Sequence, residues 1–341
     1  MIYADSIKNQ VSKFCVQIGN DPLLVQGAGG NISWKDGGAL WIKASGTWLA
    51  DAQKKDIFLP VDLCHLQESI EAGNFKIKPK VLVQSALRPS IETLLHVLMP
   101  HKIVVHLHAI EALAHLVRAK PHETIAKAIG NGVNWICIDY YTPGEQLAAG
   151  VAAQLKTKSN TDVVFLCNHG IVIGASTITE LNDKLQKIVS TLRCTTLPIV
   201  DTDSGDRSPF IVGTQIYLPC GDSALHQLAI NPSLLQRLEQ NWVLYPDHAV
   251  FLGGQAVIIE QSESLANLKT LDLEWPAFIF ISEVGVFENS TVTLAQKAQL
   301  RCYYDVLVRQ SSTEHLVSLS RASVGKLLNW DAEQYRQAVN K

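Results

Sequence analysis

The sequence predicts an α/β or α+β protein with two domains, and three features of its residue pattern support this. Segments with helical spacing of apolar residues alternate along the chain with short runs rich in β-branched residues, an order that favours neither a helix bundle nor a sandwich. The 341 residues are enough for about two domains. One stretch, 196–210, is rich in Asp, Ser, Gly and Pro. We therefore expect a first α/β domain at 1–196, a linker at 197–210 and a smaller α/β domain at 211–341.

The predicted helices are segments in which apolar residues recur every three or four positions. They cover 7–18, 92–98, 110–117 and a segment that follows Pro143-Gly144 and ends near Leu155. The predicted strands are short apolar runs with many Val, Ile and Phe residues. They cover 40–45, 103–108, 163–174, 249–254 and 277–282.

Composition excludes several classes of protein. A net charge of -3 supplies no basic surface for nucleic acid. No run approaches the roughly 18 uninterrupted apolar residues that span a membrane. The 7 cysteines are scattered and form no CxxC pair, which indicates reduced thiols in a cytoplasmic protein rather than disulfides or a cysteine-based zinc site. The high apolar share, 47%, is compatible with a homo-oligomer.

Two histidines in one predicted strand have the spacing of metal ligands. His106 and His108 project from the same face, because side chains alternate along a strand, while Ile103, Val105 and Leu107 project from the other. A single buried histidine is usually a hydrogen-bonded core residue, but two on one apolar strand would bury two polar groups side by side. We interpret the pair as ligands of a metal ion.

A third candidate ligand is His169, at the end of a predicted strand. Gly170 follows it and permits a tight turn. For His169 alone, the residues leave the ligand and core interpretations open. Three neutral imidazoles would leave a fourth tetrahedral position free for water or substrate, the arrangement of catalytic zinc.

Glu92 lies four residues before His96, which places both near one face of a helix that Ser90 can cap. The simplest interpretation is a first-turn carboxylate favoured by the helix dipole. Near a metal, the same carboxylate could accept a proton or act as a labile ligand. We expect its burial to raise its pKa toward the working range.

Two glycine-containing segments, 25–33 and 43–47, could bind an anion. Their backbone N–H groups, the Asn31 amide and the hydroxyls of Ser33, Ser45 and Thr47 suit a phosphate or carboxylate, although a plain turn-rich hairpin would show the same pattern. The segment is neither a Walker loop nor a dinucleotide fingerprint.

In chain order, the motifs are GGN at 29–31, SG at 45–46, SxE at 90–92, HxH at 106–108 and NHG at 168–170. This order resembles the class II aldolase/adducin family over about the first 195 residues. The resemblance implies a three-layer α/β/α fold around a mainly antiparallel sheet. It also implies one divalent cation per chain, most often Zn2+ with Mn2+ or Co2+ as alternatives, held by His106, His108 and His169, with Glu92 as the acid/base.

The resemblance further implies that Gly30, Asn31, Ser45, Gly46 and Ser90 hold the phosphate of a sugar-phosphate substrate. One departure is Ile91, which stands where the family pattern has a second serine. The later part of the chain looks like the aldolase half of bifunctional rhamnulose-phosphate aldolase/dehydrogenase proteins. The family resemblance also implies a homo-oligomer, with a tetramer favoured.

We therefore expect a metal-dependent aldolase that cleaves a sugar phosphate or related hydroxy-carbonyl compound through a metal-stabilised enediolate. Three alternatives remain at this stage: epimerisation or dehydration at the same site, a non-enzymatic interaction module as in adducin, and a zinc hydrolase. The expected partner is a small molecule, with no nucleic acid or membrane. The second domain shows no convergent polar set and is expected to be a cover or an oligomerisation element.

Overall fold

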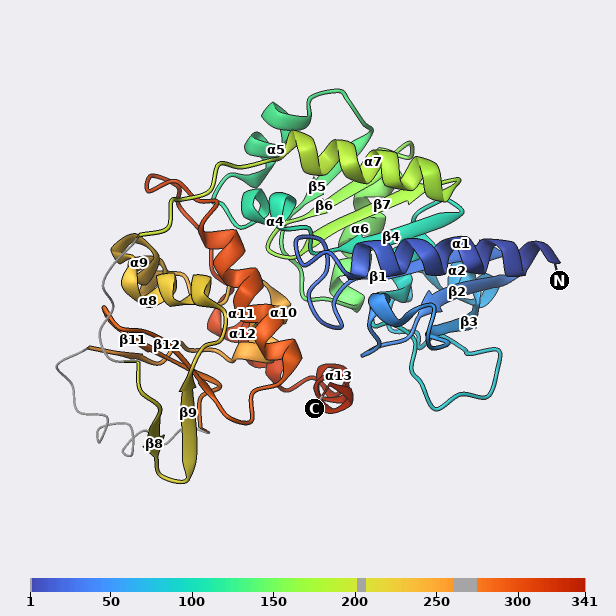
Figure 1. Ribbon diagram of the computed structural model, residues 1–341. Helices are drawn as coiled ribbons and strands as arrows, with labels where there is room; N and C mark the ends of the chain where they lie inside the picture. The colour runs from blue at the N-terminus through green and yellow to red at the C-terminus, as the bar shows by residue number, and fades with distance from the viewer. Residues whose placement is uncertain (1, 201–206, 261–274, 341) are drawn as a thin grey trace.

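The computed structural model describes residues 2–200, 207–260 and 275–340, and Figure 1 shows their arrangement around two β-sheets. The larger sheet has seven strands in the order β3-β2-β1-β4-β7-β6-β5. All neighbouring strands in it are antiparallel except β5 and β6, so the sheet is mainly antiparallel, as the family resemblance implied. Its strands are β1 (Asn31–Asp36), β2 (Ala39–Lys43), β3 (Phe58–Asp62), β4 (Ile103–Leu107), β5 (Trp135–Ile138), β6 (Val163–Leu166) and β7 (Gly170–Ala175).

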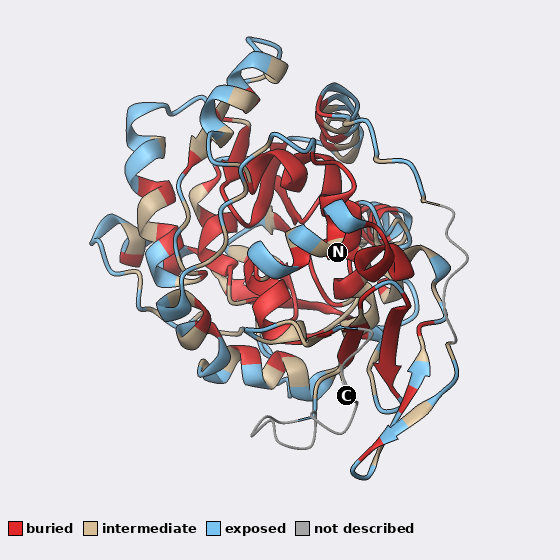
Figure 2. Cartoon of the chain, turned by 90° about the vertical axis from the view of Figure 1, so that its left-hand side faces the viewer, coloured by how far each residue is buried: buried red, intermediate tan, exposed pale blue. Residues whose placement is uncertain are grey.

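Helices cover both faces of this sheet because its central strands are apolar on both sides. In β4, Ile103, Val105 and Leu107 pack into the core on one face, whereas Val104 packs into the core on the other. Figure 2 shows these strands almost wholly buried. The first face carries α1 (Ile2–Gly19), α4 (Ile110–Leu116), α5 (Pro121–Ile129) and α7 (Ile178–Thr191). The second face carries α2 (Leu63–Glu71), α3 (Thr93–Leu98) and α6 (Glu145–Thr157). This is the predicted three-layer α/β/α arrangement.

The smaller sheet has five strands in the order β10-β11-β12-β9-β8. These are β8 (Phe210–Val212), β9 (Gln215–Pro219), β10 (Ile258–Ile259), β11 (Phe278–Ile281) and β12 (Gly285–Asn289). The helices of this part are α8 (Gln227–Ile230), α9 (Pro232–Gln240), α10 (Pro246–Leu252), α11 (Leu294–Leu307), α12 (Arg321–Leu328) and α13 (Asp331–Val339). The sheets lie on either side of the expected linker, 197–210, of which residues 201–206 lie outside the described residues.

The helix α4 joins the two parts, because its two sides pack into different cores. Ala112 and Leu116 belong to the core of the larger sheet, and Ile110, Leu113 and Val117 belong to the core of the smaller part. A buried ion pair reinforces this junction, since Nε of Arg309 lies 3.0 Å from Oε1 of Glu111.

Two details differ from the sequence-based expectations. The strand expected at 249–254 is wrong, because 246–252 form the helix α10. Pro246, with its fixed φ, occupies the first turn of that helix, and the short apolar run after it suits either a strand or a helix.

The helix expected from Glu92 begins at Thr93. The Ser90 hydroxyl accepts a hydrogen bond from the Glu92 N–H but does not cap the helix itself. Among the described residues, no helix is both long and apolar enough to cross a membrane.

Candidate metal centre

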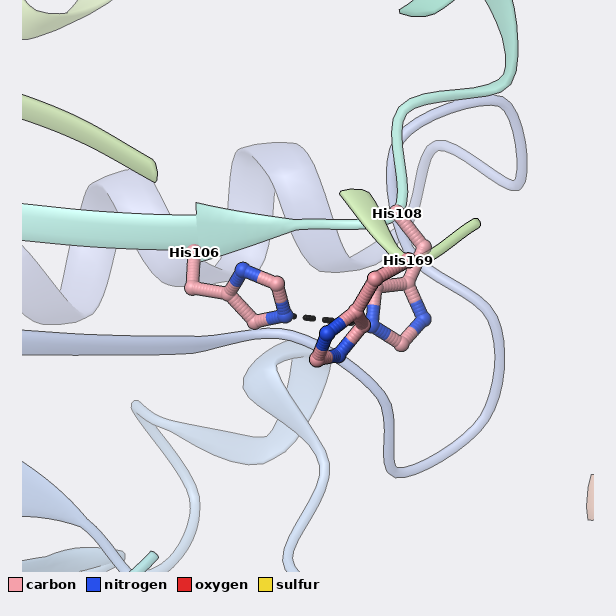
Figure 3. Close-up of side chains that lie close together, drawn as sticks. All are labelled: His106, His108 and His169. Carbon is pink, nitrogen blue, oxygen red and sulfur yellow. Dashed lines mark hydrogen bonds between the residues drawn. The ribbon is translucent and has the colours of Figure 1, made fainter. Parts of the chain in front are cut away.

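Three histidines meet where the central strands β4 and β7 of the larger sheet end and begin. His106 lies on β4 and faces the side covered by α3, because it shares its strand face with Val104. Its Nδ1 lies 3.1 Å from the Ile171 carbonyl oxygen on the adjacent strand, a hydrogen bond that fixes the ring and leaves Nε2 toward the centre. His108 follows one residue beyond the strand, and its Nε2 lies 3.1 Å from Nε2 of His106. Figure 3 shows these two rings together with His169.

His169 comes from the tight turn between β6 and β7. The preceding residue, Asn168, has a positive φ of 53°, which an asparagine tolerates, and its side-chain amide donates to the carbonyl oxygens of Leu244 (2.9 Å) and Val317 (2.7 Å). At Gly170, a Cβ atom would meet the Leu107 carbonyl oxygen and would lie 3.0 Å from Cδ2 of His108. One potential ligand nitrogen from each of the three histidines lies within 4.8 Å of the others.

Glu92 lies against this triad. Its Oε1 is 3.1 Å from Nε2 of His169, and its Oε2 is 3.4 Å from Nε2 of His106. Nδ2 of Asn31 donates to Oε2 over 2.9 Å. Asn31 is in turn held by Nε2 of His96, whose Nδ1 lies 2.8 Å from the Ser33 hydroxyl. This buried chain of hydrogen bonds orients the carboxylate toward the imidazoles.

Burial sets the protonation states. It lowers the pKa of His106 to about 3, so the ring is neutral at neutral pH, as a metal ligand must be. Burial alone would raise the pKa of Glu92, but the neighbouring His106 and His169 outweigh it and hold that pKa well below its ordinary value. The expectation of a raised pKa for Glu92 is therefore wrong, since the imidazoles around it favour the charged form.

These side chains fit a divalent cation. They offer imidazoles converging from three backbone positions, beside an ionised carboxylate. The Nδ1 atom of His169 is buried and has no hydrogen-bond partner among the described residues. His106, His108 and His169 would hold the ion, and three nitrogen ligands leave a tetrahedral position for an oxygen ligand.

The structure places most of the expected anion-binding residues around one pocket beside the triad, but Ser33 and Thr47 do not line it. The Ser33 hydroxyl contacts His96, and the Thr47 hydroxyl donates to the Ala44 carbonyl oxygen. The expected residues on the pocket wall are Gly30, Asn31, Ser45, Gly46, Ser90, Glu92, His108 and His169. Gly30 has a positive φ of 65°, and a Cβ there would lie 3.2 Å from the His106 carbonyl oxygen, so glycine suits this close approach. Ile91 also lines the pocket and presents an apolar side chain where the family pattern has a hydroxyl.

The second part of the chain contributes charged residues to the same pocket, so the expectation that it lacks a convergent polar set is wrong. Oδ2 of Asp247, on α10, lies 3.3 Å from Nδ1 of His108. Arg336, on α13, donates from its two terminal nitrogens to the two oxygens of Asp247, each over 2.6 Å. Oε2 of Glu333 lies 3.3 Å from Nη1 of Arg336. Figure 1 shows α13 at the junction of the two parts.

Lys43, at the end of β2, is a further pocket residue that the sequence did not single out. Its Nζ donates to the Ala28 carbonyl oxygen over 3.1 Å, and no carboxylate among the described residues pairs with it. Burial, together with the nearby Arg336 charge, lowers the pKa of Lys43 to about 7.

His248, next to Asp247, does not line the pocket. Its ring packs against Trp242 and Tyr303.

Comparison with known sequences identifies the family. Residues 9–196, more than half of the chain, match the family described as Class II Aldolase and Adducin N-terminal domain. The chain belongs to the class II aldolase/adducin family. The "Uncharacterized oxidoreductase YuxG" of Bacillus subtilis (strain 168) is 29% identical over 189 residues, covering 50% of this chain. The chain thus spans only 27% of the length of that curated relative.

Solved structures match about half of the chain. The N-terminal class II aldolase domain of a conserved Thermoplasma acidophilum protein is 28% identical, with a TM-score of 0.46, over 54% of this chain and 90% of that one. An L-fuculose 1-phosphate aldolase is 22% identical, with a TM-score of 0.39, over 54% of this chain and 84% of that one.

Proposed function

We propose that this protein is a metal-dependent aldolase that cleaves a sugar phosphate or a related hydroxy-carbonyl compound. The observation that carries the proposal is the position of Glu92, within 3.4 Å of two imidazoles of the histidine triad and on the wall of the pocket. A general base must lie within reach of both the substrate and the group that stabilises its developing charge.

In this proposal, different residues of the chain have different roles in a reversible aldol cleavage. A divalent cation would be held by His106, His108 and His169 and would supply a Lewis acid that stabilises negative charge on a carbonyl oxygen. Glu92 takes the hydroxyl proton of the substrate as the carbon–carbon bond breaks, and then gives that proton to the carbon that kept the bonding electrons, so that two carbonyl products form. In the reverse direction Glu92 moves the proton from that carbon to the new hydroxyl. Asn31 donates to the carboxylate and fixes its direction.

We further propose that the substrate carries an anionic group. Lys43 is a buried cation on the pocket wall, while the charge of Arg336 is already paired with Asp247. The hydroxyls of Ser45 and Ser90 and the N–H groups around Gly30 suit a phosphate. In this proposal Lys43 compensates for the hydroxyl that Ile91 does not provide.

Metal content and turnover, measured together on three proteins, test the proposal. Wild type is expected to hold a divalent ion and to split a sugar phosphate into two carbonyl products. His106→Ala is expected to lose the ion of the triad and the activity. Glu92→Gln, which is nearly isosteric, is expected to keep that ion and to lose turnover by about 100-fold. Unchanged turnover in Glu92→Gln would contradict the role of the carboxylate.

Product analysis separates this reaction from its alternatives. Retention of the full carbon chain with an altered configuration would indicate an epimerase, and loss of water would indicate a dehydratase. A chain that binds no ion at the triad even after reconstitution would favour an interaction module like those of adducin.

Zinc as the triad ion, with manganese or cobalt as substitutes, and a homotetramer are also proposals. Elemental analysis and light scattering of the purified protein test them. A location in the cytoplasm stays a prediction from the scattered cysteines, all seven of which are free thiols.

A further inference from the structure

A second cluster of metal-ligating side chains lies outside the pocket. Its members are His122 on α5, Cys137 on β5 and Cys167 directly after β6. One potential ligand atom from each lies within 4.8 Å of the others. The cluster is on the face of the sheet opposite to Glu92, because Cys137 packs against the core that includes Phe165, its partner on β6.

We propose that His122, Cys137 and Cys167 form a second metal site, which binds zinc and is separate from the histidine triad. Neither the scattered cysteines nor the single histidine indicated such a site in the sequence. The parallel pairing of β5 and β6 creates it by bringing the carboxyl ends of both strands to one edge, where α5 covers them.

Two of the distances between these atoms lie close to the edges of a tetrahedral zinc site. With Zn–S bonds of about 2.3 Å and Zn–N bonds of about 2.0 Å, tetrahedral angles separate two sulfurs by about 3.8 Å and a sulfur from a nitrogen by about 3.5 Å. The Sγ atoms of Cys137 and Cys167 are 3.6 Å apart, and Sγ of Cys167 is 4.0 Å from Nε2 of His122. Zinc therefore fits with small adjustments of the side chains.

Asp139 supplies a fourth ligand in this proposal. Its Oδ1 lies 2.9 Å from Nε2 of His122, and its side chain is 84% exposed, so the carboxylate is free to turn toward the ion. His122 is 49% exposed, whereas Cys167 is buried, so the ion reaches the sulfurs from the solvent side. Without a cation, hydrogen bonding to Cys167 and burial raise the pKa of the Cys137 thiol, and zinc binding displaces such protons.

The proposed role of this second ion is structural. Cys167 lies two positions before His169 in the turn that presents that histidine to the triad. A zinc ion shared by α5, β5 and Cys167 would hold the beginning of this turn, while Asn168 holds its middle through Leu244 and Val317. The site thus positions a residue of the triad from the other face of the sheet.

Cobalt substitution of the full-length chain tests the second site, because Co2+ bound to thiolates gives a charge-transfer absorption that Co2+ bound only to imidazoles does not. The apo protein, freed of metal by chelation and kept reduced, is titrated with Co2+. The expected result is a charge-transfer band in wild type and in His106→Ala, in which the triad is broken. Cys137→Ser and Cys167→Ser are expected to lose the band and about one bound cobalt per chain.

Two further variants serve as controls. Cys64→Ser removes an exposed thiol on α2 and is expected to keep the band. His122→Ala changes a half-exposed side chain, so it tests the site without a risk to the core, and it is expected to weaken binding at least tenfold. Absence of the band in His106→Ala, or its persistence in Cys137→Ser, would overturn the proposal. So would a Cys137–Cys167 disulfide in the protein purified without reductant, because the two sulfurs would then be a redox pair. Any cobalt that Cys137→Ser still binds measures occupancy of the histidine triad alone. Loss of binding at the second site is therefore distinguishable from loss of binding at the triad.

Discussion

Removal of the Arg336 guanidinium should destabilise the pocket strongly, because it leaves a buried carboxylate without its counter-ion. The side chains of Arg336 and Asp247 are only 11% and 3% exposed and share two hydrogen bonds of 2.6 Å. Breaking such a pair from one side costs about 3–5 kcal/mol. Asp247 would retain a hydrogen bond from Gln299, at 3.3 Å, and its contact with His108. We therefore expect Arg336→Met to lose about 3 kcal/mol, the lower end of that range.

Urea unfolding of the full chain measures this loss, and hydrogen exchange of the α13 amides locates it. The matched control is Arg88→Met, because Arg88 pairs with Asp331 at the start of the same helix but both side chains are more than half exposed. Exposed pairs contribute about 0.2–1 kcal/mol, so the control should change little. Asp247→Asn combined with Arg336→Met should recover part of the stability, since a neutral amide needs no counter-ion. A loss below about 1 kcal/mol in Arg336→Met would refute the view that the pair is desolvated.

Three other predictions follow from the geometry. Gly170→Ala would force a methyl group against the Leu107 carbonyl oxygen and the triad. We therefore expect urea unfolding to show a loss of about 1–3 kcal/mol in stability and elemental analysis to show loss of the triad ion. The control Gly221→Ala, with no atom within 4 Å of the new carbon, should change neither the stability nor the metal content. Lys43 is charged below its pKa of about 7 and neutral above it, so kcat/KM for an anionic substrate should fall as the pH rises through that value. Lys43→Arg keeps the charge and should flatten this part of the profile; an unchanged profile would exclude Lys43 from substrate binding. Thr293→Ala removes the capping box of α11 and should cost about 1 kcal/mol in urea unfolding.

The sequence predicted the parts of the site that depend on local geometry. Strand alternation places His106 on the face opposite to Ile103 and Val105, and this is the face that α3 covers with Glu92. The order of the short motifs predicted the family and, through it, the fold of the larger sheet. The family match and the topology of the sheet both confirm this prediction. Local patterns sufficed here since each motif sits at the end of a strand or in a turn.

The residues that the sequence did not indicate reach the site through contacts distant along the chain. Asp247, on α10, contacts His108, and Arg336, on α13, pairs with Asp247; no spacing between positions 108, 247 and 336 reveals these contacts. Cys137 and Cys167 are likewise adjacent only because two strands are paired. The helix α10 was mistaken for a strand because periodicity cannot classify so short an apolar run.

Because the two sides of α4 pack into two different cores, the protein cannot simply be cut after its first part or fused there to another protein. A fragment that ended at residue 196 would contain every residue of the triad, yet it would expose Ile110, Leu113 and Val117, which are buried against the second part. Such a contiguous apolar surface promotes self-association. A chimera that joins the first 196 residues to another partner would therefore need a redesigned α4, in which these three positions become polar or match a new neighbour.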